Sequence, residues 1–314
     1  MIEKKKVPFI FLNGEIIPFE EAGIHPLNTA MKYASSIYDA WRGYWNPEHG
    51  ELYLFRLREH LERLLRSAKI AQIQCPYSVE EMISHHLELI RSNGLREDIH
   101  SRIILFVDAV DGGLYSTTPM GVVMAAMPLG RYFKDESRGL HCCVSSWRRI
   151  SDEDMPPRIK AAANYHNSRL AGLQARHDGY DDAIILGRDG KVTEGPGYTL
   201  FIIRDGFPIT PPVTSGILEG VTRDTLLILF PEVLSRKVIE REIDRTELYV
   251  AEEAFFCGSG AEITPILSVD RRPIGDGNPG PLTLQIRDAY FALVRGNRDF
   301  HREWLLPVYD TTGR

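Results

Sequence analysis

The sequence predicts a mixed α+β protein built from two domains. Its 314 residues exceed what one ordinary hydrophobic core organises. Short apolar runs of strand character alternate with segments of helical period in both halves. A polar, charged stretch from Pro128 to Gly139 separates the halves, and we interpret it as a linker. We therefore predict a first domain over residues 1–128, a linker over 129–139 and a second domain over 140–314.

Strand and helix signals follow one another regularly in the first half. Asn13-Gly14 separates two short apolar runs, which is typical of a β-hairpin with a tight turn. Ser78 and Glu81 form a capping box that begins a helix, and Gly94 is a suitable residue for its end. We expect strands over 9–12, 15–17, 36–44, 52–55, 103–107 and 122–127, and a helix over 57–68, where leucines recur at helical spacing.

The second half mixes hairpins with longer helices. Asp189-Gly190 and Asp205-Gly206 are turn dipeptides between apolar runs. We expect strands over 140–147, 183–186, 192–193 and 200–203, and helices over 164–177, 222–229, 245–253 and 282–294. The two halves are therefore expected to form two mixed domains with a cleft between them, where cofactor sites commonly lie.

The composition excludes several classes of function. Hydrophobic residues make up 43% of the chain and charged residues 25%, as in ordinary globular proteins. A net charge of −6 with dispersed basic residues argues against nucleic-acid binding. The four cysteines lack zinc-site spacing, so we expect no metal and reduced thiols in the cytoplasm. No apolar run suits a membrane span or a signal peptide.

Lys160 is the most informative candidate for a catalytic residue. It lies between Pro156-Pro157 and a run of small residues that leads into a predicted helix. Desolvation disfavours the charged ammonium, so a buried lysine amine becomes a nucleophile toward an aldehyde. Tyr165, five residues on, is placed to hydrogen-bond such a ligand. Taken alone, the pattern is better explained by a surface lysine at a helix start and a core tyrosine.

Four further residues and one glycine-rich turn are candidate binding groups. Arg63 flanks the apolar face of its helix, and a planar guanidinium is suited to hold a phosphate. A carboxylate at Glu194 could keep a pyridine nitrogen protonated, which makes the ring an electron sink. Val221 and Thr222 at a helix start, and Ser259 in a glycine-rich turn, offer donors to anions. Singly, each is also explained as a solvated side chain or an ordinary turn.

Together, these segments resemble the fold-type IV, or class IV, pyridoxal-phosphate aminotransferases, and most closely the branched-chain amino acid aminotransferases. The resemblance covers nearly the whole chain, and the ordered set of motifs is far more specific than any one of them. The motifs are EHxxRL at 59–64, VSSWRR at 144–149, KxxxNYxNS at 160–168, TEG at 193–195, GxTRD at 220–224 and AEITP at 261–265.

The resemblance implies a smaller N-terminal α/β domain, a larger C-terminal pseudo-barrel domain and a cofactor at their interface. Lys160 would form an internal aldimine with pyridoxal 5'-phosphate and then move the proton at the substrate Cα. Glu194 would pair with the pyridine nitrogen, and Tyr165 would lie beside the ring oxygen. The phosphate would be held by Arg63, Val221, Thr222 and Ser259. The substrate pocket would comprise Tyr33, Tyr38, Arg42, His100, Arg102, Tyr132 and the backbone N–H groups of Gly260 and Ala261.

The implied activity is transfer of the amino group of branched-chain or related hydrophobic L-amino acids to 2-oxoglutarate. The family implies a homodimer or higher homo-oligomer in which the small domain completes the partner's site. The pocket motifs depart from the branched-chain pattern, because Lys32-Tyr33-Ala34 and Tyr38-Asp39-Ala40 replace HYG and FEG. Pro196 to Thr199 likewise replaces SGEN, and His100 stands where a tyrosine is common.

These departures leave alternatives open. Tyr38-Asp39 and Tyr198 are similar to residues of (R)-amine transaminases, and such changes alter the size and charge of a pocket. An (R)-amine or D-amino acid transaminase of the same fold is therefore the main alternative. Aminodeoxychorismate lyase is disfavoured by the VSSWRR and AEITP motifs. A non-catalytic binding protein is disfavoured by the joint presence of Lys160, Glu194 and Arg63.

Overall fold

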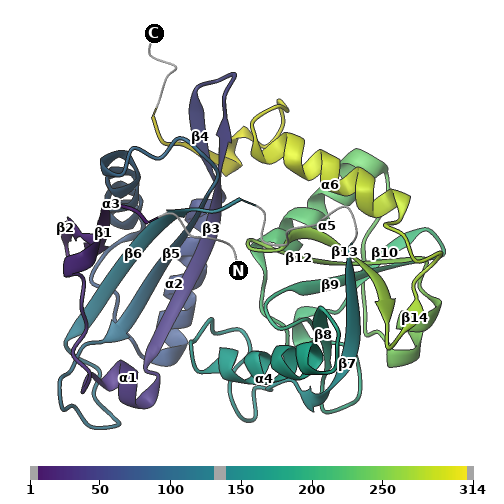
Figure 1. The fold of residues 1–314 in the computed structure, drawn as a ribbon, viewed down its shortest axis with the longest axis horizontal. Coiled ribbons are helices and arrows are strands. Elements are labelled where there is room, and N and C mark those ends of the chain that lie inside the picture. The colour runs from purple at the N-terminus through teal and green to yellow at the C-terminus, as the bar shows by residue number, and fades with distance from the viewer. Residues whose placement is uncertain (1–5, 131–138, 310–314) are drawn as a thin grey trace. The chain divides into compact units, whose positions relative to one another are not determined.

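A computed structural model describes residues 6–130 and 139–309, and these residues form two compact units (Figure 1). Among the described residues, the first unit comprises 6–130, 159–163 and 292–309, and the second comprises 139–158 and 164–291. Most of the predicted linker at 129–139 lies outside the described residues, so the predicted domain boundaries stay a prediction. Over the described ranges, every helix is too short or too polar to cross a membrane.

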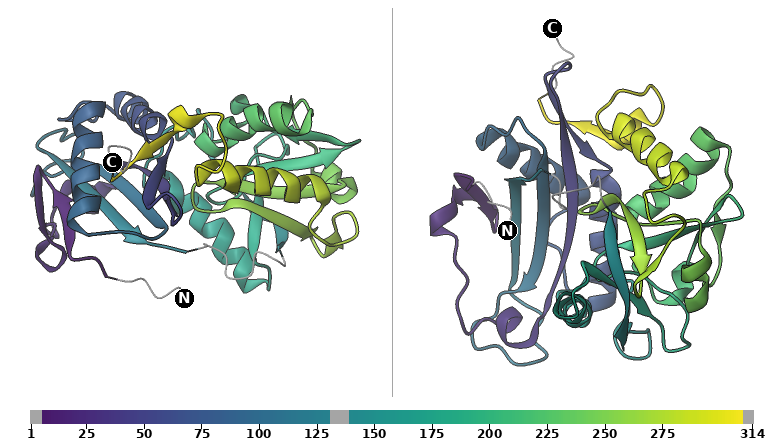
Figure 2. Two further views of the ribbon diagram at one scale, coloured as in Figure 1. Left: turned by 90° about the horizontal axis from the view of Figure 1, so that it is seen from above. Right: turned by 45° about the vertical axis from the view of Figure 1, so that its right-hand side comes forward.

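The first unit is built on a seven-stranded antiparallel sheet in the described part of the chain. Its strand order is β15-β4-β3-β5-β6-β1-β2. Strand β15, drawn in yellow in Figure 2, pairs with β4 and so brings the C-terminal segment into this sheet. The strands are β1 (Phe9–Leu12), β2 (Glu15–Pro18), β3 (Ser36–Asn46), β4 (Glu51–Phe55), β5 (Ile99–Val107), β6 (Met120–Pro128) and β15 (Leu305–Pro307).

The predicted hairpin and capping box are both confirmed. Strands β1 and β2 pair around Asn13-Gly14, and both turn residues have positive φ, as a tight hairpin turn requires. Ser78 caps α3 (Val79–Ser92) by accepting from the Glu81 N–H, and the Glu81 carboxylate accepts from the Ser78 N–H. The first unit also contains α1 (Thr29–Tyr33), α2 (Leu57–Ala71) and the 3-10 helix η1 (Phe19–Glu21).

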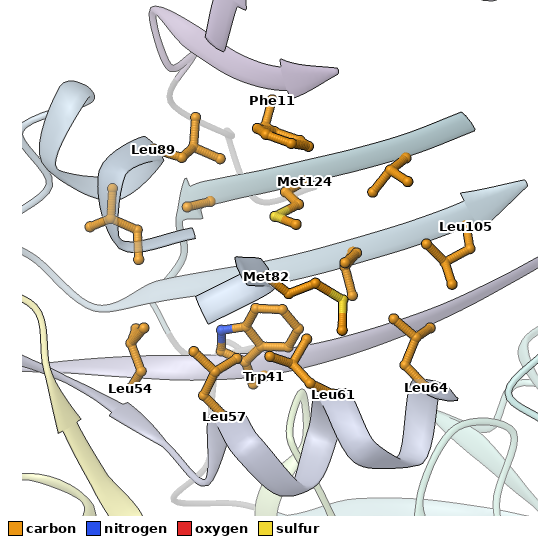
Figure 3. Close-up of a cluster of buried hydrophobic side chains, with 14 of the residues drawn as sticks. Phe11, Trp41, Leu54, Leu57, Leu61, Leu64, Met82, Leu89, Leu105 and Met124 are labelled. Atoms are coloured by element: carbon orange, nitrogen blue, oxygen red, sulfur yellow. The ribbon is translucent and has the colours of Figure 1, made fainter. Parts of the chain in front are cut away.

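Helices α2 and α3 form a hydrophobic core with one face of this sheet (Figure 3). The leucines of α2 recur at helical spacing, so they share one side of the helix and point toward Trp41 on β3. Trp41, Leu64 and Met82 are fully buried. Burying each such side chain contributes about 1.5–3 kcal/mol, which orients α2 on the sheet.

The second unit is a mixed sheet with parallel and antiparallel pairs. The order over the described strands is β11-β10-β9-β12-β13-β7-β8, with β14 on β13. The pairs β13-β7, β7-β8 and β10-β11 are parallel. The strands are β7 (Leu140–Arg148), β8 (Asp182–Leu186), β9 (Thr199–Arg204), β10 (Phe207–Thr210), β11 (Ile239–Glu240), β12 (Glu253–Gly258), β13 (Glu262–Val269) and β14 (Arg272–Pro273).

Two helices pack on this sheet. Helix α4 (Asn164–His177) runs alongside β7 and β8 and buries Ala171 and Ala175 against them (Figure 1). Helix α5 (Val221–Leu234) places Phe230 on the stacked rings of Phe201 and Phe255. The remaining elements are α6 (Pro281–Val294), η2 (Val213–Ser215), η3 (Arg245–Val250) and η4 (Arg302–Trp304).

The predicted helix over 245–253 is wrong. The segment is a 3-10 helix over Arg245–Val250, capped by Asp244 and Glu247, and Glu253 already begins strand β12. The apolar residues after Glu253 are fully buried in a strand that pairs on both sides. The Glu253 carboxylate accepts from the N–H groups of Leu282 and Thr283 at the start of α6. Sheet pairing and this cap therefore override the local helical pattern.

The buried His86 predicts a loss of stability in mild acid. His86 lies on α3 against Trp41, and among the described residues neither ring nitrogen has a hydrogen-bond partner. Burial lowers the pKa of His86 to about 3. Between that value and about 6.5, the unfolded chain takes up a proton that the folded protein excludes. The free energy of unfolding should therefore fall by up to about 1.4 kcal/mol per pH unit over this range.

Urea unfolding measured from about pH 7 to about pH 4 tests this. His86→Phe keeps a ring against Trp41 and should give a shallower dependence on pH. The same change at the exposed His177 should leave the dependence as in the wild type. An equally steep dependence in the His86 variant would contradict the assignment.

Candidate active site

Lys160 lies in an extended segment that pairs with the start of β3. The Lys160 carbonyl accepts from the Tyr38 N–H at 2.9 Å, and the Ala162 N–H donates to the Ser36 carbonyl at 3.1 Å. The Lys160 N–H donates to the hydroxyl of Ser67 on α2 at 3.2 Å. Strand β4 pairs with β3 only from Gly43 onward, so this segment takes the edge that β4 leaves. The backbone of the candidate lysine is thus held by strand pairing.

The Lys160 side chain is half-buried next to an aromatic ring. Its Nζ lies 5.1 Å from the centre of the Tyr38 ring. Its charge also contributes to lowering the pKa of the buried His60. An amine on a fixed backbone in partly desolvated surroundings suits nucleophilic attack on an aldehyde.

Arg63 is bound by a carboxylate that the sequence reasoning did not connect with it. Its Nε donates to Asp39 Oδ2 and its Nη2 to Asp39 Oδ1, both at 2.8 Å, in a bidentate ion pair. Asp39 is fully buried, and Arg63 is 4% exposed. Asp39 Oδ1 also accepts from the Ala40 N–H at 2.7 Å. The pairing uses one edge of the guanidinium and fixes the plane in which its other N–H groups lie.

His60 completes this cluster as a neutral ring. Its Nδ1 lies 2.7 Å from Asp39 Oδ1. Burial lowers the pKa of His60, and the Arg63 and Lys160 charges lower it further, against the opposite effect of Asp39. Burial alone would raise the pKa of Asp39, but Arg63 and His60 more than offset this and hold it far below its usual range. Asp39 is therefore ionised and accepts a hydrogen bond from His60 Nδ1–H.

Four of the predicted pocket residues share the other face of the same sheet. Tyr38 and Arg42 alternate with Asp39 and Trp41 along β3, so the two sets point to opposite faces. Arg42 is directly opposite His100 on β5, and Arg102 is opposite Ala40. The Arg42 Nη1 donates to the Gly130 carbonyl at 2.9 Å. The register thus places Tyr38, Arg42, His100 and Arg102 on one sheet face.

Tyr33, another predicted pocket residue, lies on neither β3 nor β5. Tyr33 ends α1, is 44% exposed, and has the Lys32 ammonium 5.4 Å from its ring centre. Tyr132 lies outside the described residues.

Glu194 lies in the second unit, where Arg149 binds it. Glu194 Oε1 is 2.6 Å from Arg149 Nη2, and Oε2 accepts from the Leu218 N–H at 3.2 Å. Both side chains are buried, so the attraction is little weakened by water. Glu194 is therefore held as a carboxylate in one orientation, and its capacity to hold a positively charged N–H group is preserved.

The predicted anion-binding residues lie at a helix start and in a turn. Val221 and Thr222 are the first two residues of α5, follow Gly220 at its N-cap, and are buried. Backbone N–H groups at such a helix end lack intrahelical acceptors and favour anions. Residues 259–261 connect β12 to β13, because Gly258 pairs with Glu262. This turn therefore places Ser259, Gly260 and Ala261 where β12 ends and β13 begins. Tyr165 lies half-buried in the first turn of α4.

Sequence reasoning missed three residues of these clusters: Asp39, His60 and Arg149. His60 and Arg149 belong to the EHxxRL and VSSWRR motifs, so the motifs themselves were an available signal. Asp39 was noted only as a departure within the pocket. Tyr198, another departure, is half-buried and packs against the core of the second unit, with its ring centre 5.3 Å from that of Phe256.

Comparison with known proteins reveals relatives along nearly the whole chain. A family model described as Amino-transferase class IV matches residues 36–269. The probable branched-chain-amino-acid aminotransferase of Aquifex aeolicus is 41% identical over 312 residues, 99% of this chain and 100% of that protein.

Solved structures agree with this likeness. The branched-chain aminotransferase from Thermoproteus uzoniensis, crystallised with norvaline, has a TM-score of 0.92 at 40% identity and covers 97% of this chain and 100% of its own. The branched-chain amino acid aminotransferase from Thermobaculum terrenum, in its PLP-containing holo-form, has a TM-score of 0.90 at 41% identity, with coverages of 96% and 98%.

The buried ion pair predicts a strong effect of Asp39→Asn on stability. The change leaves the Arg63 charge buried without its carboxylate, which typically costs about 3–5 kcal/mol. Because the pKa of Asp39 is lower when folded, its contribution is present above about pH 4 and lost as the pH falls below that value.

Urea unfolding of the cofactor-free protein at several pH values measures both effects. Asp39→Asn should lower the unfolding midpoint near neutral pH and reduce the loss of stability in acid. Asp111→Asn, at an exposed residue of the same unit, is the control and should change little. A wild-type midpoint for the Asp39 variant would refute the role of the pair.

Proposed function

Because the chain belongs to the class IV aminotransferase family, we propose that it transfers the amino group of branched-chain or related hydrophobic L-amino acids to 2-oxoglutarate. The protein is a pyridoxal-phosphate-dependent aminotransferase and acts on amino acids and 2-oxo acids. The observation that carries the substrate proposal is full-length likeness to branched-chain aminotransferases at about 40% identity, together with an intact set of Lys160, Arg63 and Glu194.

The donor set fits pyridoxal phosphate, which carries an aldehyde, a phosphate and an aromatic nitrogen. When bound, the cofactor supplies an electron sink for charge that develops at the substrate Cα. Lys160 Nζ would bind the aldehyde carbon, and its amine would serve as the base for the proton at the substrate Cα. Glu194, held ionised by Arg149, would keep the ring nitrogen protonated. Arg63, Ser259 and the helix start at Val221 and Thr222 would hold the phosphate, and Tyr165 would orient the ring oxygen.

The shared sheet face supports recognition of both substrates. Tyr38 offers apolar ring surface, and Arg42 and Arg102 offer positive charge on the same face. An apolar amino acid side chain suits the ring, whereas the second carboxylate of 2-oxoglutarate suits the guanidinium groups. Gly260 and Ala261 donate N–H groups to the carboxylate that both substrates carry.

The position of Asp39 weakens the support for the (R)-amine alternative. Asp39 lies on the α2 side of the sheet, where Arg63 neutralises it, so it adds no negative charge beside Tyr38 and Arg42. Tyr198 packs on Phe256 within the second unit. The contacts of Asp39 therefore do not support a change in the charge of the substrate pocket, and the effect of Tyr198 on the pocket stays a prediction.

Assembly and location are part of the proposal. We propose a homodimer, because Leu27, Met31, Leu114 and Tyr115 of the first unit are apolar and 47–90% exposed, and exposed apolar groups commonly mark protein interfaces. We place the enzyme in the cytoplasm, since its four cysteines are free thiols.

A half-reaction screen tests the substrate proposal. The pyridoxal form is mixed separately with L-leucine, L-glutamate, D-alanine and (R)-1-phenylethylamine, and the absorbance of the lysine-bound cofactor is followed. L-Leucine and L-glutamate should bleach the band at least about tenfold faster than the other two, a difference of about 1.4 kcal/mol in barrier. Bleaching by D-alanine or the amine alone would overturn the proposal.

Lys160→Ala tests the chemical role of the lysine. Turnover with L-leucine should fall by at least about 10²-fold, the usual effect of losing a proton-transfer group. Borohydride reduction followed by peptide mass analysis should attach the cofactor to residue 160 in the wild type and nowhere in the variant. Lys69→Ala changes an exposed lysine of the same unit and serves as the control. Full turnover by the Lys160 variant would exclude the role.

A further inference from the structure

Arg149 is fixed by acceptors at every nitrogen of its guanidinium. It directly follows β7, and its backbone N–H donates to the Leu186 carbonyl at 2.9 Å. Its Nη2 pairs with Glu194, its Nη1 donates to the Ser168 hydroxyl at 3.2 Å, and its Nε donates to the Gly216 carbonyl at 3.3 Å. The side chain is 7% exposed, so this set of contacts leaves it little freedom to turn.

The Glu194 carboxylate is oriented through these contacts. Arg149 holds Oε1, and the Leu218 N–H holds Oε2, so each oxygen has its own donor. The Glu194 backbone is equally fixed, because its carbonyl accepts from the Ile185 N–H at 2.9 Å. A carboxylate this deeply buried stays ionised only with a compensating charge, and Arg149 supplies it.

We propose that Arg149 is a positioning residue that sets the charge and orientation of Glu194, and thereby the protonation of the cofactor ring nitrogen and the retention of the cofactor. The inference rests on the cofactor role proposed for Glu194. Arg149 acts on the cofactor only indirectly, through the Glu194 carboxylate. Lysine could supply the charge but not the fork that binds Glu194, Ser168 and Gly216 together.

A cavity lies beside Arg149, so a free guanidinium ion can take the place of this side chain when a mutation removes it. The cavity has a volume of about 350 Å³ and is lined by Arg149 and by residues 150–153, 157–158, 187–189 and 213–217. Exposed Asp152 and Glu153 also line it, so it reaches the surface of the second unit. Removing the Arg149 side chain would join the space it occupied to this cavity, which a guanidinium ion can enter.

The test uses Arg149→Ala and Arg149→Lys, with Arg148→Ala as the matched control on the adjacent, exposed arginine. Affinity of the cofactor-free protein for pyridoxal phosphate and the pH titration of the bound cofactor's absorbance are measured for each. Both Arg149 variants should bind the cofactor at least about tenfold more weakly, about 1.4 kcal/mol, and should shift the titration. Guanidinium ion at low concentration should restore affinity to Arg149→Ala and change nothing in the control.

Glu194→Gln separates this inference from the proposed function. If Arg149 acts through Glu194, Arg149→Lys should add little to the loss caused by Glu194→Gln, whereas independent roles give additive losses. Additive losses, or wild-type affinity and titration in Arg149→Lys, would overturn the positioning role. Wild-type affinity and titration in Glu194→Gln alone would instead refute the cofactor role of Glu194. Arg149→Lys keeps the test decisive even if Arg149→Ala fails to fold.

Discussion

Burial of charge is the constraint on which both clusters of the candidate site depend. Arg63 and Glu194 are 4% and 5% exposed, and an isolated ion so far from water would be strongly disfavoured. Each is therefore paired with an equally buried opposite charge, Asp39 in the first unit and Arg149 in the second. The pairs keep the two groups ionised and hold them in one orientation, which a binding site requires. The same pairing makes each group sensitive to the loss of its partner.

Strand pairing fixes the backbone position of Lys160. The segment that carries Lys160 is far along the chain from β3, yet it bonds to the backbone of residues 36–38 and to Ser67. That pairing is possible only because β4 covers a later part of β3. A short piece of chain thus joins the first compact unit although the residues on either side of it belong to the second. Backbone hydrogen bonds therefore fix the point from which the lysine side chain extends.

Side chains alternate between the two faces of β3, so one face supports Arg63 and the other carries candidate substrate-binding residues. Asp39 and Trp41 face α2, where they hold Arg63 and build the core, and Tyr38 and Arg42 face the other way beside His100 and Arg102. Neighbouring residues in one motif thus serve different purposes. A substitution at Asp39 acts on the support of Arg63, whereas one at Tyr38 acts on the shared sheet face. The prediction that Tyr38 and Asp39 both change the substrate pocket did not take this alternation into account.

Local pattern by itself determined the hairpin at Asn13-Gly14, the capping box at Ser78, the leucine face of α2 and the identities of Lys160, Arg63 and Glu194 as candidates. These features depend on residues close together in the chain, so their physical causes are visible in the sequence. Only the tertiary structure decided that Asp39 pairs with Arg63, that Arg149 pairs with Glu194, and that Lys160 lies on β3 instead of starting a helix. It also extended β5 back to Ile99, where His100 and Arg102 interrupt the apolar run, and placed Glu253 in a strand instead of a helix. In each case the deciding contact joins residues distant in the chain, and burial against such partners outweighs local propensity.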